Sequence, residues 1–410
     1  MNAGDTAYDV VISGGGLVGA SLAWALAGLP VRIALVEAVP FESASQPSFD
    51  ERTIALSRSS QKILAGIGVW PEISTAACPI REIHVSERGR FGSAVMSGEE
   101  QGLGELGYVV ASRVLGAALW RRISGAANID LYCPGSLLSP RTGDDGITLQ
   151  LDSERLRGAV IGRLLVIADG ARSELRKAIG IAAAERSYGQ TAIVGNVGLS
   201  DCPSRYTAYE RFTAQGPIAL LPFHDGRYIF VMARPPEAAQ VALGLDDAGF
   251  LELLQQGFGR RLGRFVRLGR RSAYPLSLVQ ADGVTAPRAA VIGNAAHGLH
   301  PVAGQGYNLG LRDVATLAEV VADAIRAGED PGSAAALSRY EAWRRRDQRN
   351  VVAFTDGLIR LFDLPLATVG GARGMGLLLF DLAPGAKRTL ARHTMGMGGT
   401  LTRLVRGLPL

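Results

Sequence analysis

The sequence predicts an α/β (α+β) fold: a Rossmann-like domain, an inserted and largely antiparallel sheet, and a helical C-terminal region. Three observations indicate it. A strand, a glycine-rich turn, a helix and a second strand open the chain, short alternating runs fill its middle, and apolar residues at helical spacing follow residue 330. The 410 residues suffice for two domains.

The composition is that of a folded protein, with 47% hydrophobic and 20% charged residues and a formal net charge of +5. Nearly all basic residues are arginines, and no stretch combines a dense basic patch with interleaved aromatic residues. We therefore expect no nucleic-acid partner, although the basic excess favours contact with an anionic membrane surface.

Cysteine usage and the N-terminus bear on the compartment. Cys78, Cys133 and Cys202 fall in no metal or redox spacing, which favours a reducing compartment. Residues 1–9 are polar and acidic rather than a signal peptide, and no run of ~18 apolar, uncharged residues exists. We expect a cytoplasmic protein, with any membrane contact peripheral and at the inner face.

The opening unit is a βαβ motif. A short buried strand precedes Gly14-x-Gly16-x-x-Gly19, and a helix-forming run follows it. In such a turn the first glycine permits the tight bend, the second admits a pyrophosphate and the third lets the helix pack closely. Glu37 ends the next strand, where a carboxylate can accept hydrogen bonds from ribose hydroxyls. The unit predicts binding of a dinucleotide without separating FAD from NAD.

The middle of the chain changes character twice. Residues 76–104 alternate as in an antiparallel sheet, and 112–123 have a helical pattern. A buried strand over 164–168 then ends at Asp169, which opens an Asp-Gly turn. From 187 to 280, short aromatic-rich runs separated by turn residues predict a further antiparallel sheet.

The most informative stretch begins with a buried strand at 289–292, passes through Asn294 and Pro301, and enters a helix near Gly304. The N–H groups that open a helix have no intrahelical partners and carry the positive end of its dipole. Gly304 and Gly306 remove side chains, so a flat or anionic group can approach the backbone. Taken alone, the stretch is equally an ordinary strand–loop–helix connection.

The remaining polar motifs favour structural roles. We expect the basic run 344–346 to form a solvated helix face. His297 and His300 share a loop without further ligands at suitable spacing, so we expect no metal site. One helical face of the C-terminal region carries Leu337, Tyr340, Trp343, Val351, Phe354, Leu358 and Leu361.

These elements divide the chain into three parts. The predicted division is a dinucleotide-binding domain of residues 1–75, 105–182 and 285–336, a substrate-binding sheet domain of 76–104 and 183–284, and a helical region of 337–410.

Six segments carry a family resemblance that spans nearly the whole chain: 50–56, 84–89, 210–213, 216–222, 271–276 and 293–313. On these segments the sequence resembles the FAD-dependent aromatic hydroxylases of the para-hydroxybenzoate hydroxylase class. Within that class it is most similar to the 2-polyprenyl-6-methoxyphenol 4-hydroxylases of ubiquinone biosynthesis. The wider class usually has Asp at the position of Asn294, and Asn there favours the ubiquinone branch.

The resemblance implies a set of FAD-binding residues. They are Gly14, Gly16, Gly19, Glu37, Arg52, Arg113, Asp169, Asn294, Pro301, Gly304, Gly306 and Asn308. By the same resemblance Glu37 contacts the adenosine ribose and Asn294 the ribityl chain or phosphate. The flavin-facing loop runs from Pro301 through Gln305 to Asn308.

The implied activity is monooxygenation through a flavin C4a-hydroperoxide, which hydroxylates the ring of a polyprenylated methoxyphenol. NAD(P)H or a separate reductase supplies electrons, O2 is the co-substrate, and the chain contributes no nucleophile. We place the substrate against the inserted sheet, with Leu220, Pro222, Phe223 and Tyr274 as wall residues, although core packing explains these apolar residues equally well. Other ubiquinone-biosynthesis proteins are further expected partners. The polyprenyl tail and the apolar segment 375–380 motivate peripheral membrane contact.

Two alternatives stay open. One is another flavoprotein hydroxylase or reductase that acts on a different aromatic or isoprenoid substrate. The other is a non-catalytic FAD-binding subunit of a biosynthetic complex. A halogenase does not fit, because the four tryptophans are scattered and form no Trp-x-Trp-x-Ile-Pro motif.

Overall fold

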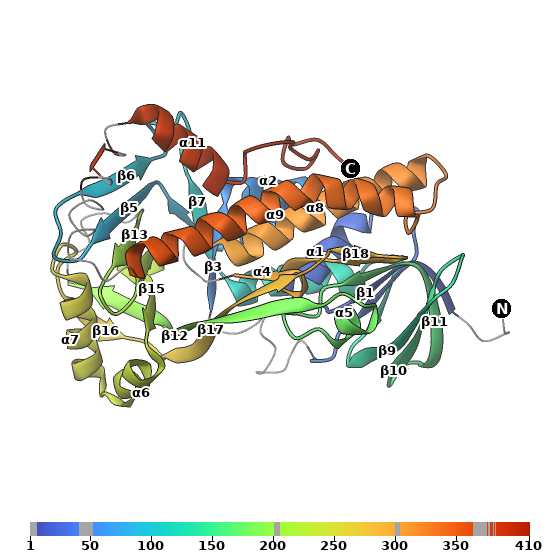
Figure 1. Ribbon diagram of the computed structural model, residues 1–410, viewed down its shortest axis with the longest axis horizontal. Coiled ribbons are helices and arrows are strands. Elements are labelled where there is room, and N and C mark those ends of the chain that lie inside the picture. The colour runs from blue at the N-terminus through green and yellow to red at the C-terminus, as the bar shows by residue number, and fades with distance from the viewer. Residues whose placement is uncertain are drawn as a thin grey trace.

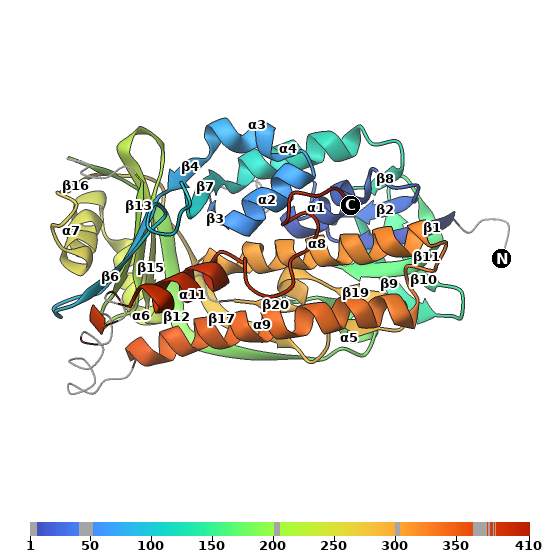
Figure 2. The ribbon, with the colours of Figure 1, turned by 90° about the horizontal axis from the view of Figure 1, so that it is seen from above.

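A computed structural model of the protein describes residues 6–40, 52–200, 206–299, 304–363, 375, 378–379, 381 and 383–410. Its two large sheets occupy opposite ends of an elongated molecule, and two long helices run along the length between them (Figures 1 and 2). This arrangement confirms the predicted α/β class with an inserted sheet.

The first large sheet is built around the opening βαβ unit. Strand β1 is parallel to β2 and β11, β11 is parallel to β19, and β2 is parallel to β8, as a Rossmann-like sheet requires. Strands β9, β10 and β18 add antiparallel pairs at its margins. The bounds are β1 (Thr6–Ser13), β2 (Ile33–Val36), β8 (Ile129–Tyr132), β9 (Gly135–Thr142), β10 (Ile147–Ser153), β11 (Arg157–Ile167), β18 (Thr285–Ala286) and β19 (Ala289–Val291).

Helices cover this sheet, so its central strands are apolar on both faces and residues 164–167 are fully buried. The helices of this part are α1 (Leu17–Leu26), α2 (Arg58–Gly66), α3 (Trp70–Ile73), α4 (Ser112–Ser124), α5 (Glu174–Ala178), α8 (Gln305–Arg326) and α9 (Ala334–Asp363). Helix α8 packs against α1, α2 and α9, which explains its burial from residue 308 to 322 (Figure 2).

The second large sheet forms the other end of the molecule. Its order is β20-β17-β12-β15-β14-β13-β5-β6, with β16 beside β12, and only the described pair β13 and β5 is parallel. The bounds are β5 (Glu82–Glu87), β6 (Ser93–Ser97), β12 (Ala183–Leu199), β13 (Thr207–Phe212), β14 (Ile218–Pro222), β15 (Arg227–Arg234), β16 (Phe265–Leu268), β17 (Ser272–Ala281) and β20 (His297–Gly298).

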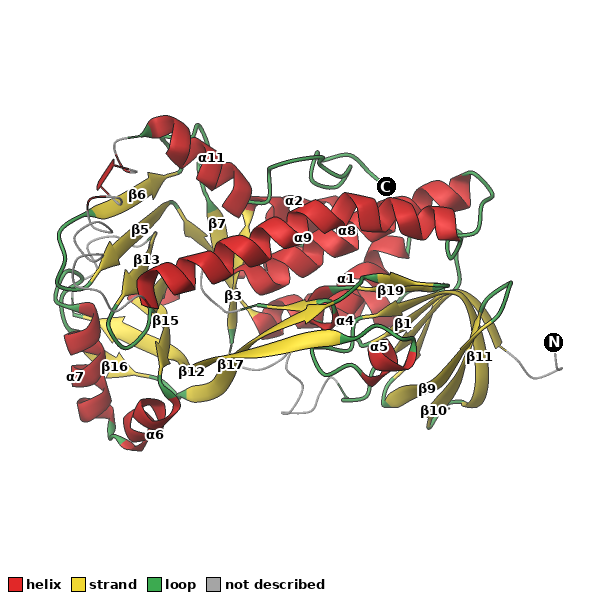
Figure 3. Ribbon diagram, viewed as in Figure 1, coloured by secondary structure: helices red, strands yellow, loops and turns green. Residues whose placement is uncertain are grey.

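Two helices that the sequence pattern did not predict cover the outer face of this sheet. They are α6 (Pro236–Gly244) and α7 (Asp247–Phe258), drawn beside the sheet in Figure 3. Phe230, Phe250 and Phe258 are fully buried between the sheet and these helices. The outer face is therefore a closed core, which leaves the inner face to line whatever space lies toward the nucleotide-binding sheet.

A small third sheet connects the two ends. It pairs β7 (Gly107–Ala111) with β3 (Thr53–Ser57) and β4 (Cys78–Ile80). Strand β4 belongs to the predicted segment 76–104, whereas the later strands of that segment, β5 and β6, join the large antiparallel sheet. A last helix, α11 (Pro384–Thr394), lies against β6, where Lys387 Nζ donates to the Val95 carbonyl oxygen at 3.2 Å.

Candidate functional site

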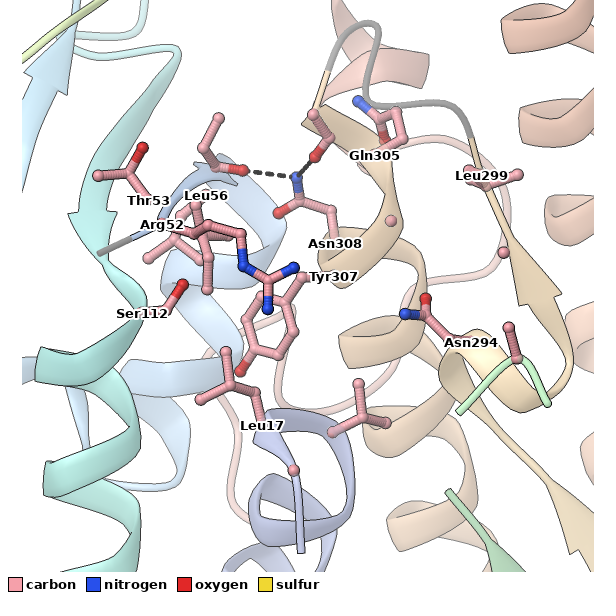
Figure 4. A pocket seen from close by; sticks show the side chains of 18 of the residues that line it. Leu17, Arg52, Thr53, Leu56, Ser112, Asn294, Leu299, Gln305, Tyr307 and Asn308 are labelled. Carbon is pink, nitrogen blue, oxygen red and sulfur yellow. Dashed lines mark hydrogen bonds between the residues drawn. The ribbon is translucent and has the colours of Figure 1, made fainter. Parts of the chain in front are cut away.

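One cavity of about 1410 Å³ extends from the glycine-rich turn to the inner face of the antiparallel sheet. Small-molecule pockets are typically ~300–1,000 Å³, so this cavity has room for a dinucleotide and a second molecule. Its walls come from β1, α1, β2, β3, α8 and the strands of the second sheet. Figure 4 shows the part around the start of α8.

The glycine-rich turn forms one end of the cavity. Gly14 and Gly16 line it, whereas Gly19 packs beneath: a Cβ on Gly19 would lie 1.9 Å from the Gly14 carbonyl oxygen. Glu37 also lines the cavity, and its carboxylate accepts hydrogen bonds from the backbone N–H of Gly15 at 2.6 Å and of Val39 at 2.9 Å. The predicted ribose-binding carboxylate is thus fixed beside the predicted pyrophosphate turn.

The Asp-Gly turn adds a second acid to this end. Asp169 follows β11 and lines the cavity with Gly170. Burial raises the pKa of Asp169 above its usual value, although a hydrogen bond with Ser173 opposes the rise.

The start of α8 projects into the middle of the cavity. Gly304 precedes the helix in a left-handed conformation, with φ of 60°, and Gly304, Gln305 and Gly306 line the cavity. A Cβ on Gly306 would meet nothing within 4 Å, so the first turn borders open space. The N–H groups of that turn have no partner within the helix and present positive dipole charge to any group bound there.

The side-chain amide of Asn308 is fully engaged by the surrounding fold. Its side-chain N–H groups donate to the carbonyl oxygens of Ala55 and Gly304, at 2.7 and 2.6 Å (Figure 4). Its oxygen accepts from Ser57 N and Ser60 Oγ, at 2.8 and 2.7 Å. Asn308 borders the cavity, but its amide ties α8 to β3 and α2.

The other predicted cofactor residues differ in whether they line the cavity. Asn294 lies in η4 (Gly293–Ala295), is exposed and lines the cavity, and Arg52 lines it from the opposite side of α8 (Figure 4). Arg113 is exposed at the start of α4 and does not line the cavity. Pro301 lies outside the described residues.

A buried ionic cluster supports the Asn294 loop from behind. Asp313 Oδ2 bonds to His297 Nε2 at 2.6 Å and accepts from Gly293 N at 3.1 Å. Asp313 Oδ1 accepts from Arg344 Nε at 2.7 Å and from Gln348 Nε2 at 2.9 Å. Burial alone would raise the pKa of Asp313, but His297 and Arg344 hold it well below its usual range.

This cluster corrects the expectation for 344–346. Arg345 and Arg346 are exposed, but Arg344 is 3% exposed and pairs with Asp313 and Asp347. The pattern failed because Asp313 comes from α8, a partner that local spacing cannot reveal. His297 is structural, as expected, and His300 lies outside the described residues. No group of metal-ligating side chains occurs among the described residues.

Of the four predicted residues of the sheet wall, three do not line the cavity. Leu220 is fully buried on the outer face among the aromatic residues under α7, and Ala219 and Leu221 line the cavity instead. The reason is strand alternation: successive side chains of β14 point to opposite faces. Pro222 and Phe223 do not line the cavity, whereas Tyr274 does.

One lining residue escaped the sequence analysis. Glu210, in β13, is partly exposed and lines the cavity. Burial raises its pKa from 4.5 to about 7, and desolvation is the whole cause. The available signal was the alternation of Ala208, Glu210 and Phe212, which places a carboxyl between two apolar side chains on one strand face.

The site fits FAD on its own geometry. Glu37 and the glycine turn suit a nucleoside diphosphate, and the α8 start suits a flat ring system that gains negative charge. The apolar sheet face beyond it leaves room for an organic substrate.

The comparisons agree with this geometry. A family model described as "FAD binding domain" matches residues 7–355. The chain is 37% identical to Ubiquinone hydroxylase UbiL of Rhodospirillum rubrum over 99% of this chain and 94% of that protein. It is 33% identical to 3-demethoxyubiquinol 3-hydroxylase of Escherichia coli, over 95% of this chain and 98% of that protein. It is 30% identical to human Ubiquinone biosynthesis monooxygenase COQ6, over 91% of this chain and 89% of that protein.

Solved structures share the fold. p-Nitrophenol 4-monooxygenase PnpA from Pseudomonas putida superposes with a TM-score of 0.79 at 18% identity, covering 97% of this chain and all of that one. PqsL from Pseudomonas aeruginosa superposes with a TM-score of 0.74 at 22% identity, covering 91% of this chain and 99% of that one.

The chain therefore belongs to the family of FAD-binding aromatic-ring monooxygenases, and FAD is its cofactor.

Proposed function

We propose that this protein hydroxylates the aromatic ring of a polyprenylated methoxyphenol in ubiquinone biosynthesis. One observation carries the proposal: a single cavity joins a dinucleotide cradle, an open helix start and an apolar sheet face. The relatives, which include a ubiquinone hydroxylase and a ubiquinone biosynthesis monooxygenase, support the substrate class.

In this proposal the chain's residues hold and orient rather than react. Gly14, Gly16, Glu37, Asp169 and Asn294 would hold FAD. When bound, FAD supplies the redox chemistry, accepting a hydride equivalent from NAD(P)H or a reductase and delivering one oxygen atom of O2 to the ring. The N–H groups at the start of α8 stabilise negative charge, and the sheet face positions the ring and excludes water.

We further propose that the antiparallel sheet, within 76–104 and 183–284, is the substrate domain. Most of the remaining cavity wall, within 1–75, 105–182 and 285–336, would then serve the cofactor. The helical region adds Phe354, Leu390, Thr394 and Met395 to the wall. The α8 start is the junction, because it lines the cavity between the glycine turn and the sheet.

Product analysis tests the function. The purified holoenzyme is mixed with a 2-methoxyphenol that carries a short prenyl chain, NAD(P)H, a general flavin reductase and isotopically labelled O2. We expect substrate-dependent NAD(P)H oxidation and a product with one labelled oxygen on the ring. FAD binding without any labelled product would favour the non-catalytic subunit, and a reduced product without labelled oxygen would favour a reductase.

We also propose peripheral contact with an anionic membrane. The hairpin between β5 and β6 exposes Arg88, Arg90 and Phe91, and Phe91 is 81% exposed. Met375 and Leu379, from the apolar segment 375–380, are also exposed, although most of that segment lies outside the described residues. None of the helices in the described part of the chain has the length and apolar character to cross a bilayer.

A basic hairpin with an aromatic tip suits the headgroup region, because arginines attract anionic lipids and the ring enters the interface. Liposome flotation at low salt should therefore retain the protein on phosphatidylserine vesicles, and Phe91→Ser should weaken retention. Equal flotation of the two proteins would remove the hairpin from the proposal.

A further inference from the structure

Glu210 stands in an apolar row on the inner face of the antiparallel sheet. Strand register places it directly beside Val85 of β5 and Ala219 of β14. The cross-strand row that shares its face and lines the cavity continues through apolar residues only: Ala94, Val85, Ala219, Val231 and Val194. Among the described lining residues of this sheet, no other carries a carboxyl group.

The carboxyl has no partner in the described part of the chain. None of those residues donates a hydrogen bond to Glu210 or forms an ion pair with it, and burial alone accounts for its raised pKa. The adjacent cation, Arg211, belongs to the other face of β13, where it donates to Ser86 Oγ at 3.2 Å. A carboxyl that is withdrawn from bulk water inside a cavity and has no protein partner costs free energy, so packing does not explain its presence.

The partner must then come from what the cavity binds. A ring placed on this face is surrounded by apolar side chains, and its polar substituent would find a hydrogen-bond acceptor at Glu210. Of the groups on a methoxyphenol, only the phenolic hydroxyl can donate a hydrogen bond. A carboxylate is an acceptor only, so the chemistry of donor and acceptor matches.

We propose that Glu210 is a catalytic residue that binds the phenolic hydroxyl of the substrate and accepts its proton during hydroxylation. The proposal rests on the proposed function. A carboxyl with a pKa of about 7 lies closer to a phenol, with a pKa near ~10, than an ordinary glutamate does. Proton transfer from substrate to Glu210 is correspondingly less unfavourable.

The proton and electrons balance over the cycle. The O–H bond of the phenol breaks, its proton goes to the Glu210 carboxylate, and its electron pair spreads to the ring carbons ortho and para to the oxygen. One of these carbons forms the C–O bond with the oxygen atom that the FAD-dependent reaction delivers. The ring carbon then loses its own proton to solvent to restore aromaticity, and the Glu210 carboxylic acid returns a proton to the phenolate oxygen. The other oxygen atom of O2 leaves as water, with the two electrons of the reductant and two protons.

Three variants of the holoenzyme test this assignment. Glu210→Gln keeps the shape and removes the proton acceptor, and Glu210→Asp keeps the acceptor on a shorter side chain. Glu185→Gln is the matched control, because Glu185 is an exposed residue of β12 in the same sheet and does not line the cavity. The probe is 2-methoxy-6-prenylphenol. Its Kd, from quenching of tryptophan fluorescence, and kcat/KM are measured from pH 5.5 to 9, with Tm as the check on folding.

For the wild type we expect affinity and kcat/KM to rise as pH increases through about 7, where Glu210 ionises. Glu210→Gln should lose both pH dependences and about 100-fold in kcat, the usual scale for general-base removal. Glu210→Asp should keep the pH dependence and recover part of the rate. Glu185→Gln should match the wild type, and removal of a buried charge should not lower the Tm of Glu210→Gln.

The outcomes separate this inference from the proposed function. A wild type that hydroxylates the probe while Glu210→Gln keeps its rate and pH profile overturns the role of Glu210 and leaves the function intact. A wild type whose probe affinity depends on Glu210 and pH, but which releases no hydroxylated product, supports the Glu210 contact and overturns the proposed reaction. Failure of the wild type to bind the probe overturns both.

Discussion

The clusters around Asp313 and Glu210 are two enclosed carboxyl environments with opposite character. Asp313 is fully buried and receives four bonds, from Gly293, His297, Arg344 and Gln348. Glu210 faces a cavity and has no partner among the described residues. The pKa of Asp313 is accordingly far below its usual range, whereas that of Glu210 is raised to about 7.

The difference separates a structural charge from a functional one. A carboxylate whose hydrogen-bonding capacity is filled by the fold stabilises that fold and has nothing left for a ligand. A carboxyl that the fold leaves unsatisfied destabilises it until a ligand arrives. The two carboxyls should therefore affect the measured free energy of unfolding in opposite ways.

Removing the charge of Asp313 should have the largest effect. Asp313→Asn leaves the Arg344 guanidinium buried beside a neutral amide, and breaking a buried pair in this way costs about 3–5 kcal/mol. Because the Asp313 pKa is lowered on folding, the carboxylate stabilises the wild type above the unfolded pKa, ~3.9, and that contribution declines as pH falls below it. Urea unfolding at pH 7 and at pH 3 measures both effects.

The matched control is Asp152→Asn. Asp152 pairs with Arg157, but both side chains are largely exposed, at 65% and 79%. Exposed pairs are worth less than about 1 kcal/mol, so this variant should unfold almost like the wild type. Equal losses in the two variants would show that the Asp313 cluster carries no special stability.

The two faces of β14 provide an intermediate test. Leu220→Ala opens a cavity in the packed core under α7 and should cost about 2–4 kcal/mol without changing substrate affinity. Leu221→Ala enlarges the ligand cavity instead, so its unfolding free energy should fall less and the probe phenol should bind more weakly. The reverse pattern would show that the substrate contacts the outer face.

The sequence predicted what local spacing encodes and missed what depends on register and distance. The βαβ turn, the Asp169 turn and the α8 start follow from short motifs, and the structure brings them to one cavity. The face of Leu220 could not be predicted, because Ala219 and Leu221 are also apolar, so the sequence of this strand carries no alternation of polarity.

Long-range partners explain the other errors. Arg344 is buried only because Asp313 lies on the neighbouring helix, and a basic run by itself indicates a solvated surface. Arg113 was expected from the resemblance alone, and its local sequence does not show that it is exposed outside the cavity lining. Glu210 was overlooked because its significance depends on apolar neighbours contributed by five other strands.

The smallest predicted effect has the opposite sign. The Glu210 pKa is raised on folding, so its contribution to stability is complete below the unfolded pKa of 4.5 and is lost as pH rises through about 7. At 1.36 kcal/mol for each pKa unit the loss would approach ~3 kcal/mol, and water in the cavity should reduce it to about 1–2 kcal/mol.

Glu210→Gln escapes this loss. Its unfolding free energy relative to the wild type should therefore increase by that amount between pH 4.5 and pH 8, whereas for Asp313→Asn the relative value should become more negative from pH 3 to pH 7. Urea titrations of the three proteins across this range measure the two slopes. If the unfolding free energies of the wild type and Glu210→Gln change equally with pH, Glu210 is solvated in the folded protein. In that case Glu210 is not a carboxyl that the fold leaves unsatisfied, and the contrast with Asp313 is wrong.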